Sequence, residues 1–248
     1  MLLKDKVAFI TGGGSGIGEA TAKLFAAEGA NVIIADIDEV SGERVNNEIG
    51  SRANFIKCDV TNEENVFEVI NEITKKYNRL DCAVNNAGVT GTPANIEDTI
   101  YDNWSKVIQV NLTGVFFCLK HEISQMIKQG FGSIVNVSSG AGLIAVPSMA
   151  SYCASKHALL GLTKTAATEN LARGIRVNSV LPGSTKTPLL DQALNMSEGM
   201  EEIILNSIPS GKFGTPQEVA EGIAWLCSDR ASFVSGASLA IDYGTVSR

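Results

Sequence analysis

The glycine-rich segment Thr11–Gly18 (TGGGSGIG) constrains the fold of this chain more than any other stretch. It follows a short apolar run, Val7–Ile10, and leads into a segment of helix-forming residues, Glu19–Glu28. In a strand, glycine turn and helix of this order, the backbone can approach a pyrophosphate closely and the N–H groups at the helix start bind it. The segment therefore predicts a dinucleotide-binding unit near the amino end of the chain.

Asp36 indicates which dinucleotide is bound. It ends the next predicted strand, Asn31–Ala35, and a carboxylate there can accept hydrogen bonds from both ribose hydroxyls of NAD and would repel the extra phosphate of NADP. Positions 13 to 15 and position 37 hold no Arg or Lys that could receive that phosphate. NAD is therefore the predicted cofactor, and the alternative is that Asp36 only caps the helix that follows it.

Strands and helices alternate along the rest of the chain. A helix capped by Thr61 or Asn62 is predicted to run to about Tyr77, and a long helix to span Asp102 to about Gln129. Further strands are predicted at Asn54–Cys58, Leu80–Val84, Ser133–Val137, Ile175–Leu181 and Ala237–Asp242. This alternation predicts an α/β fold with a doubly wound parallel sheet, and no linker-like stretch divides residues 1–248 into more than one domain.

Tyr152 and Lys156 lie four residues apart in another predicted helix, so their side chains share one face. A free tyrosine ionises near ~10, and its use in proton transfer near neutral pH requires about 4 kcal/mol of phenolate stabilisation, which a neighbouring ammonium can supply in part. The alternative is a surface pair without function. Ser139 follows a predicted strand at its carboxyl end, where ligand sites of open α/β sheets lie.

Composition favours a small-molecule partner. The chain has 27 acidic and 20 basic residues, a net charge of −7, which argues against binding to nucleic acid or to an anionic membrane. The five cysteines form no C-x-x-C pair, so we expect no metal site. We expect these cysteines to be reduced thiols. The sequence shows neither a secretory signal nor an apolar run of about 18 residues, and we expect a cytoplasmic protein.

The segment 188–210 departs from the alternating pattern. Its apolar residues, Met196 among them, and Gly199 predict two short helices that form a mobile flap over the site. Residues 140–149 are mostly apolar and predict the opposite wall of a pocket. A pocket of this kind favours a neutral, largely apolar secondary alcohol or its ketone.

Several motifs together resemble those of the short-chain dehydrogenase/reductase family. They are Thr11-Gly12-x-x-x-Gly16-Ile17-Gly18, Asn85-Asn86-Ala87-Gly88, Asn111, Ser139, Tyr152-x-x-x-Lys156 and Pro182-Gly183-x-x-x-Thr187, in the order and at the spacing of that family. The resemblance covers essentially the whole chain. It implies a single Rossmann-type domain of about seven parallel strands, a homotetramer, and hydride transfer between a nicotinamide cofactor and an alcohol or ketone.

The resemblance also implies roles for individual residues. Tyr152 would be the acid/base, Ser139 would orient the substrate oxygen, Lys156 would bind the nicotinamide ribose and lower the tyrosine pKa, and Asn111 would hold a water in a proton relay. The implied cofactor contacts are Gly12, Ser15, Gly16, Ile17, Gly18, Asp36, Ile37, Asp59, Val60, Asn86, Ala87, Gly88, Tyr152, Lys156, Pro182, Gly183, Thr185 and Thr187.

Within the family, the sequence is similar to NAD-dependent alicyclic-alcohol dehydrogenases, and two other functions stay open. A 3-oxoacyl-[acyl-carrier-protein] reductase would use basic residues at the ends of two long helices, where this chain has Arg173 and Gly130. A non-catalytic dinucleotide-binding regulator would be expected to lack one of the catalytic residues. The chain departs from the family after its last strand, where Tyr243 replaces a usual Gly.

Overall fold

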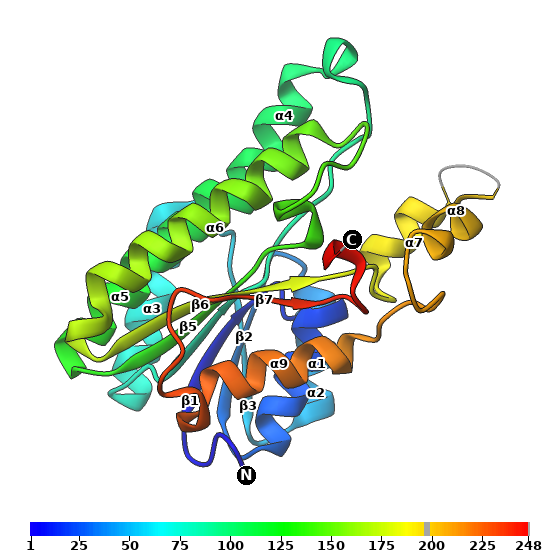
Figure 1. Ribbon diagram of the computed structural model, residues 1–248. Helices are drawn as coiled ribbons and strands as arrows, with labels where there is room; N and C mark the ends of the chain where they lie inside the picture. Colours follow the sequence, from blue (N-terminus) through cyan, green and yellow to red (C-terminus); the bar gives the residue numbers. More distant parts are fainter. Residues whose placement is uncertain (196–198, 248) are drawn as a thin grey trace.

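A parallel sheet of seven strands forms the centre of the protein, in the order β3-β2-β1-β4-β5-β6-β7 (Figure 1). The computed structural model describes residues 1–195 and 199–247. The strands are β1 (Val7–Thr11), β2 (Asn31–Asp36), β3 (Ala53–Lys57), β4 (Cys82–Asn85), β5 (Gly132–Val137), β6 (Ile175–Pro182) and β7 (Ser238–Ile241). The predicted α/β class and the doubly wound parallel sheet are confirmed, and the strand ends differ from the predicted ones by two residues at most.

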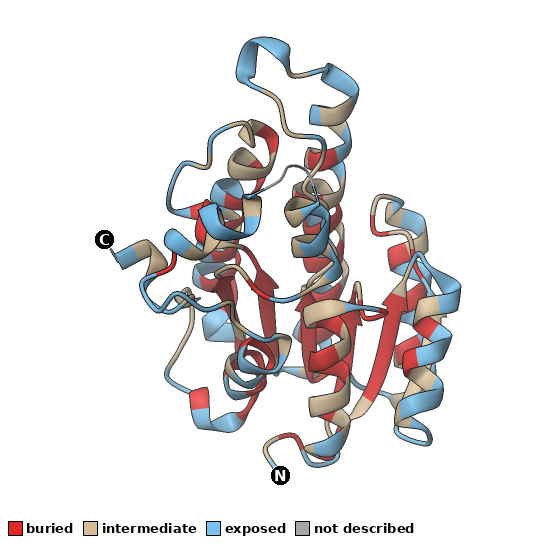
Figure 2. Ribbon diagram, turned by 90° about the vertical axis from the view of Figure 1, so that its right-hand side faces the viewer, coloured by how far each residue is buried: buried red, intermediate tan, exposed pale blue. Residues whose placement is uncertain are grey.

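Helices cover both faces of the sheet. The long helices are α1 (Gly16–Ala27), α2 (Glu39–Ile49), α3 (Glu63–Tyr77), α4 (Tyr101–Ile108), α5 (Val115–Gln129), α6 (Ala150–Asn170) and α9 (Pro216–Cys227). Helices α3, α5 and α6 pack on one face, and α1, α2 and α9 pack on the other (Figure 1). Within β1, Val7 and Phe9 enter the first core and Ala8 and Ile10 enter the second, as side chains that alternate along a strand must. Figure 2 shows the resulting layers, with buried strands and helices exposed on their outer sides.

The strand order reverses between β1 and β4. From β1 the chain adds β2 and β3 on one side of the sheet, and from β4 it adds β5, β6 and β7 on the other side. The loops after these two strands therefore diverge and leave a crevice at the carboxyl ends of the strands. In open α/β sheets this is where ligands bind. The glycine segment follows β1 and Asn86 follows β4, so the fold brings both predicted motifs to the crevice.

The long helix predicted at Asp102–Gln129 is wrong in one respect. Residues Gln109–Gly114 between α4 and α5 form a π-helical segment. Asn111 lies inside this segment, fully buried, and its side-chain amide forms two hydrogen bonds with the backbone of Val89. Segments of this kind occur frequently at functional sites, because the extra residue changes the direction of a side chain.

A buried polar network joins the sheet to α5 and α6. Asn85 Nδ2 donates to Glu122 Oε2 and to Asn136 Oδ1, both at 3.0 Å, and Asn136 Nδ2 donates to Thr163 Oγ1 at 2.9 Å. Glu122 is fully buried, and burial raises the pKa of its carboxyl from 4.5 to about 8. Glu122 Oε1 and Asn85 Oδ1 have no hydrogen-bond partner among the described residues, and both are acceptors while Glu122 is ionised. Protonation of Glu122 gives these two oxygen atoms an O–H donor and avoids a buried charge.

We expect Glu122→Gln to remove a pH dependence of stability. With a pKa of 4.5 in the unfolded chain and about 8 in the folded one, the unfolded chain alone releases the proton between these values. The contribution of Glu122 to the free energy of unfolding is therefore largest below about pH 4.5 and falls by up to ~1.4 kcal/mol per pH unit as the pH rises toward 8. Glutamine is neutral at every pH and resembles the protonated acid.

Urea unfolding of the wild type and of Glu122→Gln over this pH interval checks the expectation. Glu169→Gln is the matched control, because Glu169 is an exposed glutamate on α6. Parallel pH profiles for the wild type and Glu122→Gln would show that Glu122 is ionised in the folded protein.

Candidate active site

The glycine segment forms an open loop, called the glycine cradle below, in which residues larger than glycine do not fit at several positions. Gly12 and Gly16 have φ angles of 62° and 53°, in the left-handed region that favours glycine. A Cβ on Gly18 would lie 2.0 Å from the carbonyl oxygen of Gly12. The backbone at the start of α1 is therefore accessible to a ligand, and its shape fits a pyrophosphate at a helix amino end.

Asn86 holds this cradle from the opposite side of the crevice. Its Nδ2 donates to the carbonyl oxygens of Thr11 and Gly12, both at 3.0 Å, and its backbone N–H donates to Thr11 Oγ1 at 3.0 Å. The side chain that the sequence marks as a cofactor contact is thus bound to the loop itself. Its structural role is to fix the distance between the ends of β1 and β4.

A cavity of about 760 Å³ runs from the glycine segment along the ends of β2, β3 and β4. Its lining includes these predicted cofactor contacts: Gly12, Ser15, Gly16, Ile17, Asp36, Ile37, Asp59, Val60, Asn86, Ala87, Gly88 and Thr187. A second cavity of about 380 Å³ adjoins it and is lined by Ser139, Tyr152, Lys156, Pro182, Gly183 and Thr185. Gly18 and Asn111 line neither cavity, because Gly18 lies against Gly12 and Asn111 lies one layer deeper.

Asp36 points toward the glycine segment at the end of β2. Its Oδ2 accepts a hydrogen bond from the N–H of Gly14 at 2.9 Å, and its Oδ1 accepts one from Asp38 at 3.0 Å. The helix α2 is capped by Asp38, whose carboxylate accepts from Val40 and Ser41. The alternative that Asp36 serves as the cap of this helix is therefore wrong, and its carboxylate lines the large cavity.

One basic residue near Asp36 was not identified from the sequence. Arg44 on α2 donates from Nη2 to the carbonyl oxygen of Gly14 at 3.0 Å, which brings a cation to the glycine segment from 30 positions along the chain. Its guanidinium is paired with Glu19 at 2.6 Å and with Glu48 at 2.8 Å. These carboxylates neutralise the charge of Arg44, so Arg44 does not offset the repulsion between Asp36 and a phosphate.

Ser139, Tyr152 and Lys156 meet at the second cavity. Ser139 follows β5 and begins a short helical turn, where its Oγ accepts from the N–H of Ala141 at 3.1 Å. Tyr152 and Lys156 lie one turn apart on α6, with Lys156 Nζ 5.6 Å from the centroid of the Tyr152 ring. The three residues predicted as a catalytic group thus share one pocket wall.

The ionisation of this group differs from the expected one. Burial raises the pKa of Tyr152, and a hydrogen bond with Ser139 opposes this effect only in part. Lys156 is buried, donates from Nζ to the carbonyl oxygen of Val137 at 2.8 Å, and has its pKa lowered to about 8 by burial. The expected lowering of the tyrosine pKa by Lys156 is therefore not found, because the ammonium is directed at a backbone carbonyl and is itself destabilised by burial.

Asn111 lies directly behind Lys156 and Gly88. Its Nδ2 donates to Val89 O at 2.9 Å and to Ser155 Oγ at 3.2 Å, while its Oδ1 accepts from Val89 N at 2.8 Å. A carbonyl oxygen has two lone pairs, so Oδ1 can still accept from a water. Asn111 thereby fixes the loop after β4 against the residue that precedes Lys156 in α6.

The wall of the second cavity is largely apolar. It contains Ile144, Val146, Met149, Leu189, Leu190, Ala193 and Ile204, and Lys156 is the basic residue among the described residues that line it. The predicted two short helices of the flap are confirmed as α7 (Pro188–Leu194) and α8 (Met200–Asn206), whereas Met196 lies outside the described residues. A wall of this kind suits an uncharged ligand.

The carboxyl-terminal segment also lines this cavity, through Asp242, Thr245 and Val246, which sequence reasoning missed. The sequence contained a signal for this position. The segment follows the last strand of a parallel sheet, so it leaves the sheet at the same edge as Ser139. Among the described residues, no helix is long and apolar enough to cross a membrane, and no three His, Cys, Asp or Glu side chains are grouped to hold a metal ion.

Comparison with known proteins identifies the family. A family model described as enoyl-(acyl carrier protein) reductase matches residues 12–246. The chain belongs to the short-chain dehydrogenase/reductase family. It is 40% identical to a 2,5-dichloro-2,5-cyclohexadiene-1,4-diol dehydrogenase of Sphingobium indicum, over 98% of this chain and 97% of that protein. It is 39% identical to a cyclohexanol dehydrogenase of an Acinetobacter species, over 96% of this chain and 94% of that protein.

Among solved structures, the chain resembles a 3-ketoacyl-(acyl-carrier-protein) reductase from Brucella melitensis complexed with NADH. The TM-score is 0.92 at 35% identity, and the match covers 98% of this chain and 99% of the other. This short-chain dehydrogenase/reductase thus has the fold predicted from its sequence.

We expect Asp36→Asn to shift the cofactor preference from NAD toward NADP. The substitution removes the charge that would oppose a phosphate and keeps an oxygen for the hydrogen bond from Gly14. Like charges in contact cost several kcal/mol, so the ratio of kcat/KM for NADP to that for NAD should rise by at least about tenfold. Steady-state kinetics with both cofactors measure it. Glu39→Gln is the control, because Glu39 is an exposed carboxylate outside the cavity, and an equal shift in this variant would contradict the role of Asp36.

Proposed function

We propose that this protein is an NAD-dependent oxidoreductase that interconverts a neutral, largely apolar secondary alcohol and its ketone. The observation that carries the proposal is the apolar cavity of about 380 Å³ with Ser139 and Tyr152 in its wall. Lys156 is the basic residue among the described residues of this wall, and its ammonium is bound to the carbonyl oxygen of Val137, so these residues offer a substrate carboxylate or phosphate no second cation. The relatives named for cyclic alcohols support a cyclic substrate.

Support for the cofactor comes from the residues of the large cavity. The glycine cradle fits a pyrophosphate, Asp36 fits a ribose without a phosphate, and the related Brucella reductase is described as a complex with NADH. The contacts proposed for NAD are the predicted ones, with two adjustments. Asn86 acts by holding the loop, and Gly18 acts by letting α1 approach Gly12. When bound, NAD accepts or donates the hydride.

In the proposed reaction the side chains handle the proton and the substrate oxygen. Ser139 donates a hydrogen bond to that oxygen, and Tyr152 takes the hydroxyl proton during oxidation and returns it during reduction. Lys156 contributes hydrogen-bond donors for the ribose, through the two N–H groups that remain beside its bond to Val137. Asn111 can hold a water behind Lys156 through its remaining lone pair.

The alternative of a 3-oxoacyl-[acyl-carrier-protein] reductase is favoured by the likeness to the Brucella enzyme. The surface argues against it. Gly130 ends α5 with a φ of 81° and has no side chain for a carrier protein, and Arg173 donates to Asn170 Oδ1 at 3.3 Å. The other alternative, a non-catalytic regulator, is disfavoured because Ser139, Tyr152 and Lys156 are all present in one pocket.

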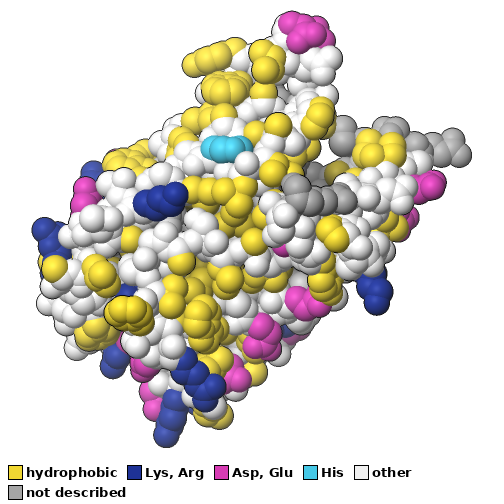
Figure 3. Space-filling view, in the orientation of Figure 1, with side chains coloured by type: hydrophobic (Ala, Val, Ile, Leu, Met, Phe, Trp, Pro, Cys, Tyr) yellow, Lys and Arg dark blue, Asp and Glu magenta, His cyan; other side chains and the backbone are white. Residues whose placement is uncertain are grey.

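We also propose that the protein works as a cytoplasmic homotetramer. Its five cysteines are free thiols, and apolar side chains cover much of the centre of the face shown in Figure 3. Large apolar side chains exposed on the described residues include Phe116, Ile127, Leu171, Trp225 and Phe233. Exposed apolar side chains that form a contiguous patch are typical of protein interfaces. Light scattering behind size exclusion should give the mass of four chains, and the mass of one chain would refute this assembly.

The proposed activity is tested by nicotinamide absorbance with neutral cyclic and linear secondary alcohols, a dicarboxylate hydroxy acid and an acyl-thioester ketone, each with both cofactors. We expect turnover of cyclic alcohols with NAD. A dicarboxylate as best substrate would refute the apolar pocket as the specificity element. Turnover of acyl-thioester ketones alone, with NADPH, would favour the carrier-protein alternative.

Tyr152→Phe should lower kcat at least about 100-fold, because the ring keeps its packing while the group that transfers the proton is lost. The affinity for NAD, measured by fluorescence titration, should change little. Tyr101→Phe is the control, since Tyr101 is exposed at the start of α4 and lines neither cavity. Full turnover by Tyr152→Phe would exclude this residue as the acid/base.

A further inference from the structure

The carboxyl-terminal segment after β7 folds into a compact turn over the substrate cavity. Asp242 organises it: Oδ1 accepts from the N–H of Gly244 at 2.9 Å, Oδ2 accepts from that of Val246 at 2.8 Å, and the carbonyl oxygen accepts from that of Thr245 at 3.2 Å. The N–H of Ser247 donates to Gly244 O at 3.1 Å. Each backbone N–H from residue 244 to residue 247 thus has a partner within the turn.

This turn touches the catalytic wall. A Cβ built on Gly140, the residue after Ser139, would lie 3.1 Å from Val246 Cγ1. Asp242, Thr245 and Val246 line the same cavity as Tyr152 and the flap residue Leu190. The position of the turn therefore sets how much room a substrate has beside Ser139.

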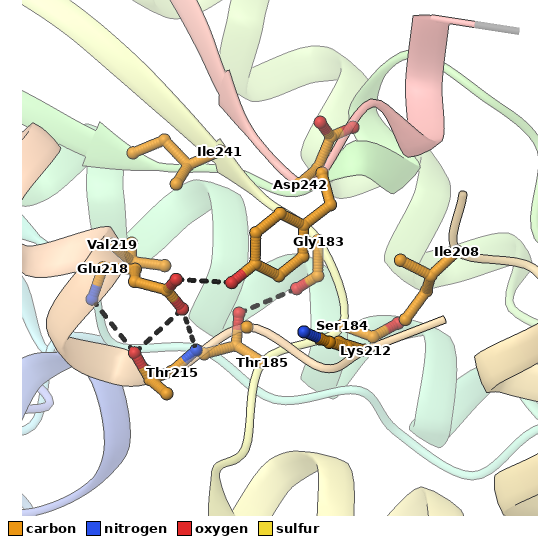
Figure 4. Close-up of a pocket in the computed structure, with 12 residues that line it drawn as sticks. Gly183, Ser184, Thr185, Ile208, Lys212, Thr215, Glu218, Val219, Ile241 and Asp242 are labelled. Atoms are coloured by element: carbon orange, nitrogen blue, oxygen red, sulfur yellow. Dashed lines mark hydrogen bonds between the residues drawn. The ribbon is translucent and has the colours of Figure 1, made fainter. Parts of the chain in front are cut away.

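Tyr243 connects this turn to α9. Its hydroxyl donates to Oε1 of Glu218, and Oε2 of the same carboxylate accepts from Thr215 N at 2.7 Å and Thr215 Oγ1 at 2.9 Å (Figure 4). Thr215 Oγ1 in turn accepts from the N–H of Glu218, which completes the capping box of α9. The turn is thereby tied to the first residues of a helix that packs against α1 and the sheet.

Two further features mark Tyr243 as more than a chance surface contact. It has a φ of 52°, a left-handed conformation that is costly for an aromatic residue and free of cost for glycine. It also lines a cavity of about 70 Å³ together with Ile208, Lys212 and Glu218, and this cavity shares Gly183, Ser184, Thr185 and Asp242 with the substrate cavity. Tyr243, itself part of the carboxyl-terminal turn, therefore shares a cavity with Ile208 and Lys212 of the segment that follows the flap.

We infer that Tyr243 is a positioning residue for the substrate pocket, whose hydroxyl, bound to Glu218, holds the turn at residues 242–247 against the catalytic wall and so restricts the pocket to small alcohols. This inference rests on the proposed function for its substrate, but the holding of the turn is independent of it. The hydrogen bond from Tyr243 keeps the pKa of Glu218 below its usual value, so the carboxylate is ionised at neutral pH. A charged acceptor strengthens such a bond.

Hydrogen–deuterium exchange of the full-length protein tests the holding of the turn. Tyr243→Phe keeps the ring and removes the hydroxyl, and the amides of residues 244–247 should exchange at least about threefold faster than in the wild type. Tyr101→Phe is the matched control and should leave these amides unchanged. In a Glu218→Ala background, Tyr243→Phe should have no further effect, because its partner is already absent.

Steady-state kinetics test the consequence for the pocket. Tyr243→Phe should raise KM for cyclohexanol by about threefold or more while KM for NAD stays the same, and it should lower the ratio of kcat/KM for cyclohexanol to that for a bulkier cyclic alcohol. Unchanged exchange in Tyr243→Phe but faster exchange in Tyr243→Gly would show that the ring holds the turn, and would overturn the role of the hydroxyl.

Faster exchange with an unchanged substrate ratio would overturn the role in specificity. If the wild type turned over no neutral alcohol, the proposed function would fail, and the exchange comparison would still decide whether Tyr243 holds the turn.

Discussion

The binding of the glycine segment by the side chain of Asn86 is the interaction on which the rest of the site depends. Two carbonyl oxygens, of Thr11 and Gly12, accept from one amide nitrogen and join the ends of β1 and β4 where the strand order reverses. This join sets the width of the crevice, since the loops after these strands would otherwise diverge freely. The cavity for the cofactor lies beside this join, and the approach of α1 to Gly12 depends on Gly18, which has no Cβ.

Burial governs the chemistry of the neighbouring pocket. Lys156 is held among the sheet, α6 and the loop after β4, which lowers its pKa to about 8 and leaves its ammonium bound to Val137. The same burial raises the pKa of Tyr152. Desolvation thus disfavours the charged form of both side chains, and an opposite charge brought to either has a larger effect than it would in water.

The fold and most site residues could be predicted from the sequence because they depend on local patterns. The apolar runs of the strands, the glycine turn and the i, i+4 spacing of Tyr152 and Lys156 involve neighbours along the chain. The π-helical segment at Asn111 could not be predicted, because the backbone of Val89 that binds its side chain belongs to another loop. Arg44 was missed for the same reason, as its approach to Gly14 requires the packing of α2 beside the glycine segment.

The sequence by itself determined the parallel α/β sheet, the glycine cradle, the acidic residue after β2 and the serine, tyrosine and lysine of the pocket, since each follows from residue type and spacing. Only the tertiary structure decided how the pKa values of these residues are shifted, that Asn86 of the crevice also binds the glycine segment, and what closes the pocket. The pKa of a buried group and the contact of the turn at residues 242–247 with Gly140 depend on distances between segments far apart in the chain. No local pattern in the sequence carries that information.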